Sequence, residues 1–227
     1  MTAYVPATGV FIVLEGSEGV GKTTQWQRLA DQLRAEGHDV VAVREPGGTA
    51  AGDEVRRMLL DPSSDLTAEA EALLFAASRA QLLRTVVRPA LARGAVVLVD
   101  RFLLSTYAYQ GAGRGLPLEE LRTINRVATG GLVPHITLLL NMPLDDSMAR
   151  MQARGATDRM ERAGIEFHSR VQLAFSTAVQ QEWQQEHPEI GPVSAVDASG
   201  SPDAVTDRCL AQLAASWPTR FAGVVHD

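Results

Sequence analysis

The amino-acid sequence predicts an α/β protein built on a parallel five-stranded sheet with helices on both faces. Five short runs are mostly apolar along their length, which is typical of strands that are buried on both sides. Segments with helical periodicity separate these runs, and a glycine-rich turn follows the first run directly. Strands that alternate with helices in this way form a parallel sheet, because each helix carries the chain back across the sheet.

The predicted elements follow one another in a regular order. Strands are expected at 10–15, 39–44, 95–100, 136–141 and 193–197. Helices are expected at 23–36, from Thr49 through Leu59, at 68–93 with a bend near Pro89, around 105–110, and at 118–128, 144–153, 165–185 and 202–216. Gly37 is placed to end the first helix, and the Pro-Gly-Gly at 46–48 ends the second strand.

The composition fits one compact domain spanning residues 1–227. No long linker divides the chain, and 45% of its residues are hydrophobic. The net charge of −6 argues against a nucleic-acid partner, because a phosphate backbone needs many cations. No signal peptide is expected in the first nine residues, and no apolar run is long enough to predict a membrane partner. Cys209 is the single cysteine, which fits a reducing cytoplasm.

A phosphate-binding loop is predicted directly after the first strand. Residues 16–23 read GSEGVGKT and fit the pattern G-x-x-x-x-G-K-[ST], between a buried strand and a helix. The glycines allow successive backbone N–H groups to point at phosphate oxygens, and the helix adds its positive N-terminal end. In such a loop Lys22 reaches the β- and γ-phosphates, and the hydroxyl of Thr23 binds Mg²⁺.

The basic residues narrow the class of nucleotide user. The chain has 21 Lys and Arg residues, and Lys22 is the one lysine among them. Codon bias explains the excess of arginine, but the loop position has kept its lysine. A GTPase that reads guanine through Asn-Lys-x-Asp is excluded, since no second lysine exists. An ATPase that acts as a switch or partner-binding module remains open beside a kinase.

A second small anion has a predicted site near the loop. Asp100 and Arg101 end the third strand, at the edge where parallel sheets bind ligands. Asp100 would orient Mg²⁺ or its waters there, and Arg101 would hold an acceptor phosphate. The alternative for Arg101 is a structural ion pair with Asp100 or with a glutamate.

Aromatic and polar residues at helical spacing suit a planar base. Phe75 and Arg79 lie four residues apart and therefore share one helix face. Ser105 and Tyr109 repeat this spacing, with Gln110 alongside. Each also has a structural interpretation: the two aromatic residues pack in the core, and Arg79 is a solvated charge.

The polar break at 154–164 is rich in arginine. Arg150, Arg154, Arg159 and Arg162 gather around it. A charged surface is the common interpretation of such a run. A small mobile LID that brings an arginine to the transferring phosphoryl group is the functional one.

Together these segments resemble the thymidylate kinase family, whose members phosphorylate dTMP to dTDP with ATP. The matching segments are FIVLEGSEGVGKTTQ (11–25), REPGGT (44–49), EALLFAASRAQ (71–81), DRFLLSTYAYQGAGR (100–114) and ARGATDRME (153–161). The resemblance implies a P-loop kinase fold with a LID at about 154–164. It also implies ATP and Mg²⁺, dTMP as the small-molecule substrate, and a homodimer.

The resemblance assigns a role to each matching residue. ATP binding falls to Gly16, Ser17, Glu18, Gly19, Val20, Gly21, Lys22, Thr23 and Thr24, with Mg²⁺ near Thr23 and Asp100. Substrate binding falls to Arg44, Glu45, Pro46, Phe75, Arg79, Arg101, Ser105, Thr106, Tyr109 and Gln110, where Phe75 stacks on thymine and Arg79 meets the base edge. Catalysis falls to Lys22, Arg101, Glu15, Arg154 and Arg159.

The loop has no arginine, because Glu18 and Val20 stand inside it. In this respect the sequence is similar to the bacterial-type members of the family, which supply that arginine from the LID. Asn141 departs from the aspartate that usually ends the fourth strand. A kinase for another nucleoside monophosphate remains an alternative to dTMP.

Overall fold

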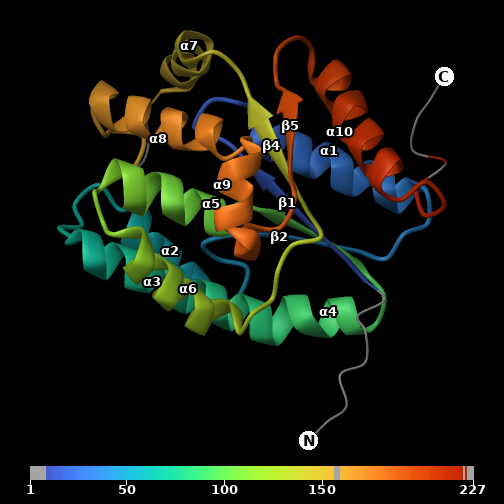
Figure 1. The fold of residues 1–227 in the computed structure, drawn as a ribbon, viewed down its shortest axis with the longest axis horizontal. Coiled ribbons are helices and arrows are strands. Elements are labelled where there is room, and N and C mark those ends of the chain that lie inside the picture. Colours follow the sequence, from blue (N-terminus) through green and yellow to red (C-terminus); the bar gives the residue numbers. More distant parts are fainter. Residues whose placement is uncertain (1–8, 156–158, 222, 224–227) are drawn as a thin grey trace, which may run out of the picture.

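The computed structural model describes residues 9–155, 159–221 and 223. Five parallel strands form one sheet in the order β2-β3-β1-β4-β5 (Figure 1). The strands are β1 (Val10–Glu15), β2 (Val40–Arg44), β3 (Val96–Asp100), β4 (Ile136–Asn141) and β5 (Val193–Asp197). The predicted fold class and all five predicted strands are confirmed.

Helices connect the strands, as Figure 1 shows. They are α1 (Lys22–Ala35), α2 (Ala50–Leu60), α3 (Ala68–Leu82), α4 (Arg88–Ala92), α5 (Leu103–Thr106), α6 (Leu118–Thr129), α7 (Leu144–Arg154), α8 (Ile165–Thr177), α9 (Gln181–Glu186) and α10 (Pro202–Ser216). Two π-helical segments, η1 (Leu83–Val87) and η2 (Tyr107–Gly113), and a 3₁₀ turn, η3 (Pro188–Ile190), complete the set.

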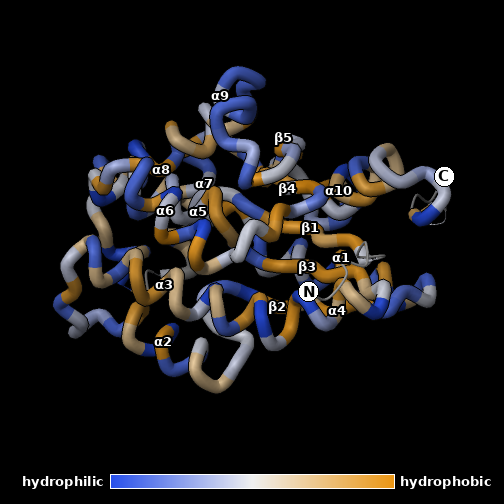
Figure 2. The backbone as a smooth tube through the Cα atoms, turned by 60° about the horizontal axis from the view of Figure 1, so that its bottom comes forward, coloured by the Kyte–Doolittle hydropathy of each residue, from blue (hydrophilic) through white to orange (hydrophobic). Residues whose placement is uncertain are grey.

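The central strand β1 is buried on both faces, and every residue in it except Glu15 is apolar. Ile12 and Leu14 lie in one core cluster with residues of α1 and α10. Phe11 and Val13 point the other way, into a cluster with residues of η1, α4 and α6. Figure 2 shows the resulting band of hydrophobic strands running through the middle of the molecule. No helix among the described residues is long and apolar enough to cross a membrane.

The strand register brings three carboxyl-terminal strand ends to one edge of the sheet. Leu14 and Arg44 are both paired with Asp100. The segments that follow these strands are the phosphate loop, the turn at 45–49 and the turn at 101–102. The sheet therefore positions the predicted site, as expected for parallel sheets.

The structure corrects two predicted helices. The stretch predicted at 68–93 is helical, but its hydrogen bonding changes at η1, just before Pro89. Proline lacks an N–H and its ring crowds the preceding turn, so a wider turn there is physically reasonable. The single helix predicted at 165–185 is wrong, because α8 ends at Thr177 and α9 begins at Gln181. No glycine or proline signals this break. Tertiary packing accounts for it, since Trp183 of α9 packs edge-on against Tyr107 of η2 and against the core.

Candidate active site

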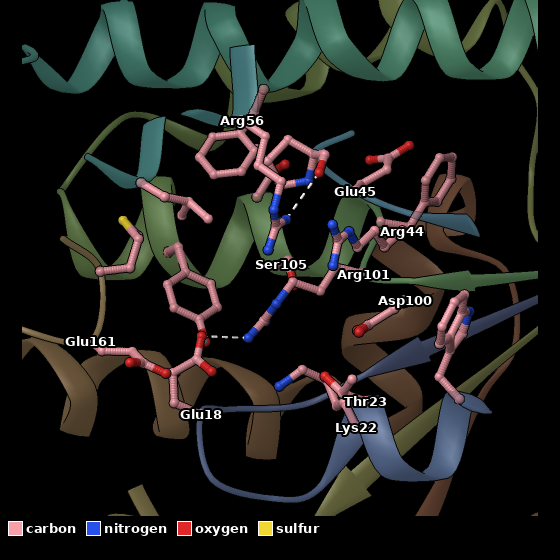
Figure 3. Close-up of a pocket in the computed structure, with 18 of the residues that line it drawn as sticks. Glu18, Lys22, Thr23, Arg44, Glu45, Arg56, Asp100, Arg101, Ser105 and Glu161 are labelled. Carbon is pink, nitrogen blue, oxygen red and sulfur yellow. Dashed lines mark hydrogen bonds and ion pairs between the residues drawn. The ribbon is translucent and has the colours of Figure 1, made fainter. Parts of the chain in front are cut away.

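One cavity of about 280 Å³ lies at the carboxyl edge of the sheet. The phosphate loop and the start of α1 line one side, and α3, α5 and η2 contribute to the rest (Figure 3). Most of the predicted site residues line it: Glu18, Gly19, Gly21, Lys22, Thr23, Thr24, Arg44, Glu45, Pro46, Phe75, Arg79, Asp100, Arg101, Ser105, Thr106, Tyr109 and Gln110. Residues from distant parts of the sequence are therefore brought together as predicted.

The shape of the loop depends on glycine at two positions. Gly16 has a φ of 144°, and a Cβ atom there would lie 2.5 Å from the carbonyl oxygen of Leu140. Gly19 has a φ of 79°, and its Cβ would lie 2.0 Å from the carbonyl oxygen of Ser147. Only glycine tolerates both the backbone conformation and the close approach. The loop is consequently held against β4 and α7 while its outer side faces the cavity.

Lys22 is a buried cation whose charge is disfavoured by its surroundings. Its side chain lines the cavity, and Nζ donates a hydrogen bond to the carbonyl oxygen of Ser17 at 2.6 Å. Burial, and next the neighbouring guanidinium of Arg101, lower the pKa of Lys22 to about 8. A bound polyphosphate would place negative charge beside Lys22 and would therefore favour the charged form of Lys22.

Arg101 extends toward the phosphate loop, as Figure 3 shows. Its Nη2 donates to Glu18 at 2.5 Å, and its Nη1 donates to the carbonyl oxygen of Gly16 at 3.2 Å and to Ser105 Oγ at 3.1 Å. The guanidinium also lies over the ring of Tyr109. The predicted ion pair of Arg101 with a glutamate is thus confirmed, and the glutamate is Glu18. This ion pair also holds the guanidinium of Arg101 between the two halves of the cavity.

The backbone of Arg101 adopts a φ of 71°, a value that residues other than glycine rarely adopt. Glu15 stabilises the backbone turn that follows Arg101. The buried carboxylate of Glu15 accepts hydrogen bonds from the N–H of Phe102 at 2.8 Å and from the N–H and hydroxyl of Ser105 at 3.0 and 2.6 Å. Glu15 therefore lies behind the cavity wall and orients Arg101 through the backbone.

Arg79 is buried and lines the cavity beside Phe75, so the shared helix face is confirmed. Nε donates to Glu45 at 2.6 Å, and the terminal nitrogens donate to Thr106, to Asn125 and to the carbonyl oxygen of Phe102. The solvated-charge interpretation of Arg79 is wrong. A guanidinium has five N–H groups, so one on Nη2 is left by these contacts for a ligand.

Glu45 is buried beside Arg79, and Oε1 has no hydrogen-bond partner within the described part of the chain. Burial raises the pKa of Glu45 to about 7, although the adjacent Arg79 opposes that change. The pair places a titratable carboxyl group in the cavity wall. The ion pair with Arg79 favours the ionised form of Glu45, whereas burial favours the neutral form.

A pair of oxygens in the cavity suits a magnesium ion. Asp100 Oδ1 is buried and has no hydrogen-bond partner among the residues described, and the hydroxyl residue Thr23 lines the same cavity. Carboxylate and hydroxyl oxygens are ligands that Mg²⁺ accepts. No group of three His, Cys, Asp or Glu residues within the described ranges could hold a metal by itself. This fits Mg²⁺ bound through one carboxylate together with substrate phosphates and water.

Comparison with known proteins agrees with this geometry. The family model for thymidylate kinase matches residues 14–193. The chain belongs to the thymidylate kinase family. It is 47% identical to the thymidylate kinase of Synechococcus sp. (strain JA-2-3B'a(2-13)) over 94% of this chain and 98% of that protein. It is 53% identical to the enzyme of Deinococcus radiodurans over 74% and 81% of the two chains, and 47% identical to that of Pseudomonas putida over 87% and 91%.

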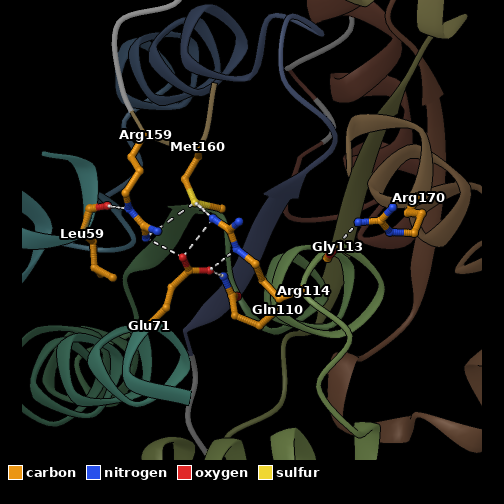
Figure 4. A network of polar contacts seen from close by, with 8 residues as sticks. All are labelled: Leu59, Glu71, Gln110, Gly113, Arg114, Arg159, Met160 and Arg170. Atoms are coloured by element: carbon orange, nitrogen blue, oxygen red, sulfur yellow. Dashed lines mark hydrogen bonds and ion pairs between the residues drawn. The ribbon is translucent and has the colours of Figure 1, made fainter. Parts of the chain in front are cut away.

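Some residues expected from the thymidylate kinase family do not line the cavity. Gly16, Ser17 and Val20 lie in the buried part of the loop. Arg154 ends α7, but its side chain lies outside the described residues, as do residues 156–158 of the LID segment. Arg159 bonds to Glu71 and, through Nε, to the carbonyl oxygen of Leu59 at 3.1 Å (Figure 4).

Sequence reasoning missed several members of this thymidylate kinase site. Trp26, Arg56, Leu60, Met160 and Glu161 also line the cavity. Arg56 donates to the carbonyl oxygen of Pro46 at 3.0 Å, which places it beside the REPGGT turn. The signal was its position about two turns into α2, the helix that follows a predicted substrate-binding segment.

Proposed function

We propose that this protein transfers the γ-phosphoryl group of ATP to the phosphate of dTMP, giving dTDP and ADP. The observation that carries the proposal is the position of Arg101. Its guanidinium contacts Gly16 and Glu18 of the phosphate loop and Ser105 of the opposite wall within one cavity. A cation in that place suits an acceptor phosphate that faces a bound triphosphate.

The residues of the cavity account for an in-line transfer. The triphosphate would lie along the loop, where Lys22 meets the β- and γ-phosphates. The nucleotide base would lie beside Phe75 and Arg79, on the far side of Arg101. An oxygen of the acceptor phosphate attacks the γ-phosphorus, the bond to the bridging oxygen breaks, and ADP leaves. Because this oxygen is already anionic, positioning and charge neutralisation carry the catalysis.

We extend the proposal to the cofactor and to the LID. Thr23 and Asp100 would hold Mg²⁺, which neutralises phosphate charge when it is bound. The segment at about 154–164 would act as a LID of a single kinase domain, with Arg154 and Arg159 directed to the triphosphate. Arg159 contacts Glu71 in this structure, so the side chain of Arg159 would have to leave Glu71 before it could assist phosphoryl transfer.

A panel of acceptors tests the substrate assignment. ADP release is measured with ATP and each of dTMP, dUMP, dCMP and AMP, and dTDP is quantified in parallel. We expect strong preference for dTMP and one dTDP formed for each ADP. Equal use of AMP would indicate a kinase for another nucleoside monophosphate. Phosphate release without any acceptor would indicate an ATPase switch.

The role of Lys22 is tested by Lys22→Ala. We expect turnover to fall by orders of magnitude, because the cation on the transferring group is lost. The circular dichroism spectrum should be unchanged, since the fold does not need this charge. Near-normal turnover in a folded variant contradicts the mechanism.

We also propose a cytoplasmic homodimer. Leu73 of α3 and Val127 of α6 are 55% and 79% exposed, and these two helices pack against each other. Exposed apolar side chains on adjacent helices support an interface there. Size-exclusion chromatography with light scattering should give a mass twice that of the 24.4 kDa chain. Val127→Glu should then shift the mass to that of one chain, and a monomeric wild type contradicts the proposal.

A further inference from the structure

A fully buried carboxylate, Glu71 of α3, lies next to the cavity without lining it. Four donor atoms from three residues converge on it, as Figure 4 shows. Gln110 Nε2 donates at 2.7 Å, Arg114 donates through Nε and Nη2 at 3.3 and 3.2 Å, and Arg159 donates through Nη2. Burial of a carboxylate is unfavourable unless it is paired, and here two guanidinium groups and one amide pair with Glu71 and fix its orientation.

The contact with Glu71 decides how the amide of Gln110 is turned. A carboxylate that pairs with two guanidinium groups accepts hydrogen bonds, so the NH₂ group of Gln110 faces Glu71. The amide oxygen diverges from the nitrogen and therefore faces away from Glu71. Gln110 lines the cavity, and its oxygen accepts no hydrogen bond from any residue that the structure describes. The cavity wall is thereby given a hydrogen-bond acceptor.

We propose that Glu71 is a positioning residue that sets base specificity by fixing the amide of Gln110. An acceptor at this place pairs with a pyrimidine that carries N–H at ring position 3, as thymine and uracil do. Cytosine presents a lone pair at the same position, so the two acceptors repel. This inference rests on the proposed function, because it takes the base to lie on the Phe75 side of the cavity.

Arg114 and Arg159 give Glu71 its fixed orientation. Arg114 also lies over the ring of Phe167, with its guanidinium carbon 4.8 Å from the ring centre. Arg159 is attached to the carbonyl oxygen of Leu59 on the other side. The carboxylate is thus held by η2, by the residue that follows it and by the segment before α8, and of these three partners Gln110 also lines the cavity.

The test replaces the carboxylate by an amide of the same shape. In Glu71→Gln, residue 71 both donates and accepts, so the amide of Gln110 is free to present either end to the base. The ratio of kcat/KM for dTMP to that for dCMP is measured in the wild type and the variant. We expect the ratio to fall about tenfold, the effect of losing one oriented hydrogen bond. The matched control is Glu69→Gln, an exposed glutamate of the same helix, which should leave the ratio unchanged.

A double-mutant cycle separates this role from general loss of structure. If Glu71 acts through Gln110, then Glu71→Gln should not change the dTMP to dCMP ratio in a Gln110→Ala background. An additional fall there, or an unchanged ratio in the folded single variant, overturns the inference. If the single variant does not fold, the wild type still decides: N3-methyl-dTMP should bind at least about tenfold more weakly than dTMP. Equal binding overturns the inference.

Failure of the proposed function would look different. In that case the wild type would not convert dTMP to dTDP at all. A wild type that forms dTDP, together with an unaltered ratio in Glu71→Gln, refutes only the positioning role of Glu71.

Discussion

Replacing Lys22 by methionine should make the protein more stable when no nucleotide is bound. Lys22 is 6% exposed, and burial together with Arg101 lowers its pKa from 10.5 to about 8. This change corresponds to about 3 kcal/mol of unfavourable free energy for the charged form at neutral pH. Methionine keeps the apolar length of the side chain. It gives up the hydrogen bond to the Ser17 carbonyl, a loss of about 1 kcal/mol. The net gain is expected to be about 1–2 kcal/mol at pH 7.

The sign of the pH dependence follows from the same pKa. Between pH 8 and 10.5 the unfolded chain binds more protons at Lys22 than the folded protein does. The wild type therefore gains stability as the pH rises through this window. From pH 7 to pH 9.5 the gain is about 2 kcal/mol, and Lys22→Met has no corresponding gain. The advantage of the variant should consequently vanish by about pH 9.5.

Urea unfolding of both proteins at pH 7.0 and 9.5, without nucleotide, measures this difference. Arg34→Met is the control, since Arg34 is an exposed cation on the same helix. The control should show no pH-dependent change relative to the wild type. A Lys22→Met variant that is less stable than the wild type at both pH values, by the same amount, would refute the reasoning. Lys22 would then keep its ordinary pKa in the folded protein.

Further variants and conditions separate the two halves of the cavity. The affinity for ATP should fall as the pH rises above about 8, because Lys22 loses its charge, and an equilibrium titration of ATP binding at pH 7 to 9.5 checks this. Arg101→Met should lower kcat/KM for dTMP by about 100-fold or more while ATP binding changes little; equal losses for both substrates would contradict its place on the acceptor side. Phe75→Leu should raise the KM for dTMP about tenfold without changing the KM for ATP, as stacking on a base requires. Gly19→Ala should abolish ATP binding in calorimetry, since the new Cβ would lie 2.0 Å from the Ser147 carbonyl oxygen; retained affinity would show that the loop can move.

The sequence predicts the sheet well because its strands carry a strong local signal. In the run VFIVLE at β1 every residue but the last is apolar, a pattern typical of a strand buried on both faces. The phosphate loop is equally local, since the spacing of its glycines and Lys22 is fixed by the backbone path. The register of the parallel strands then brings Asp100 and Arg101 to that loop without further information.

Contacts that depend on long-range packing could not be predicted in the same way. Glu71 lies in α3 two residues after the exposed Glu69, and nothing in the local sequence distinguishes the two glutamates. Its burial becomes visible only when Arg114 and Arg159 arrive from other parts of the chain. The break between α8 and α9 is of the same kind, because it coincides with the packing of Trp183 on Tyr107 and not with a helix-breaking residue.

Two buried carboxylates outside the cavity orient residues that line it. Glu15 and Glu71 are both fully buried, and each accepts at least three hydrogen bonds. Glu15 fixes the backbone turn from which Arg101 extends, whereas Glu71 fixes the amide of Gln110. Neither carboxylate lines the cavity, and each orients a residue that we propose to contact the substrate. The proposal thus assigns phosphate binding and base recognition to residues that separate carboxylates hold, so the two functions should be separable by mutation. Replacing Glu15 should weaken phosphate binding for every acceptor, and replacing Glu71 should change which base is accepted.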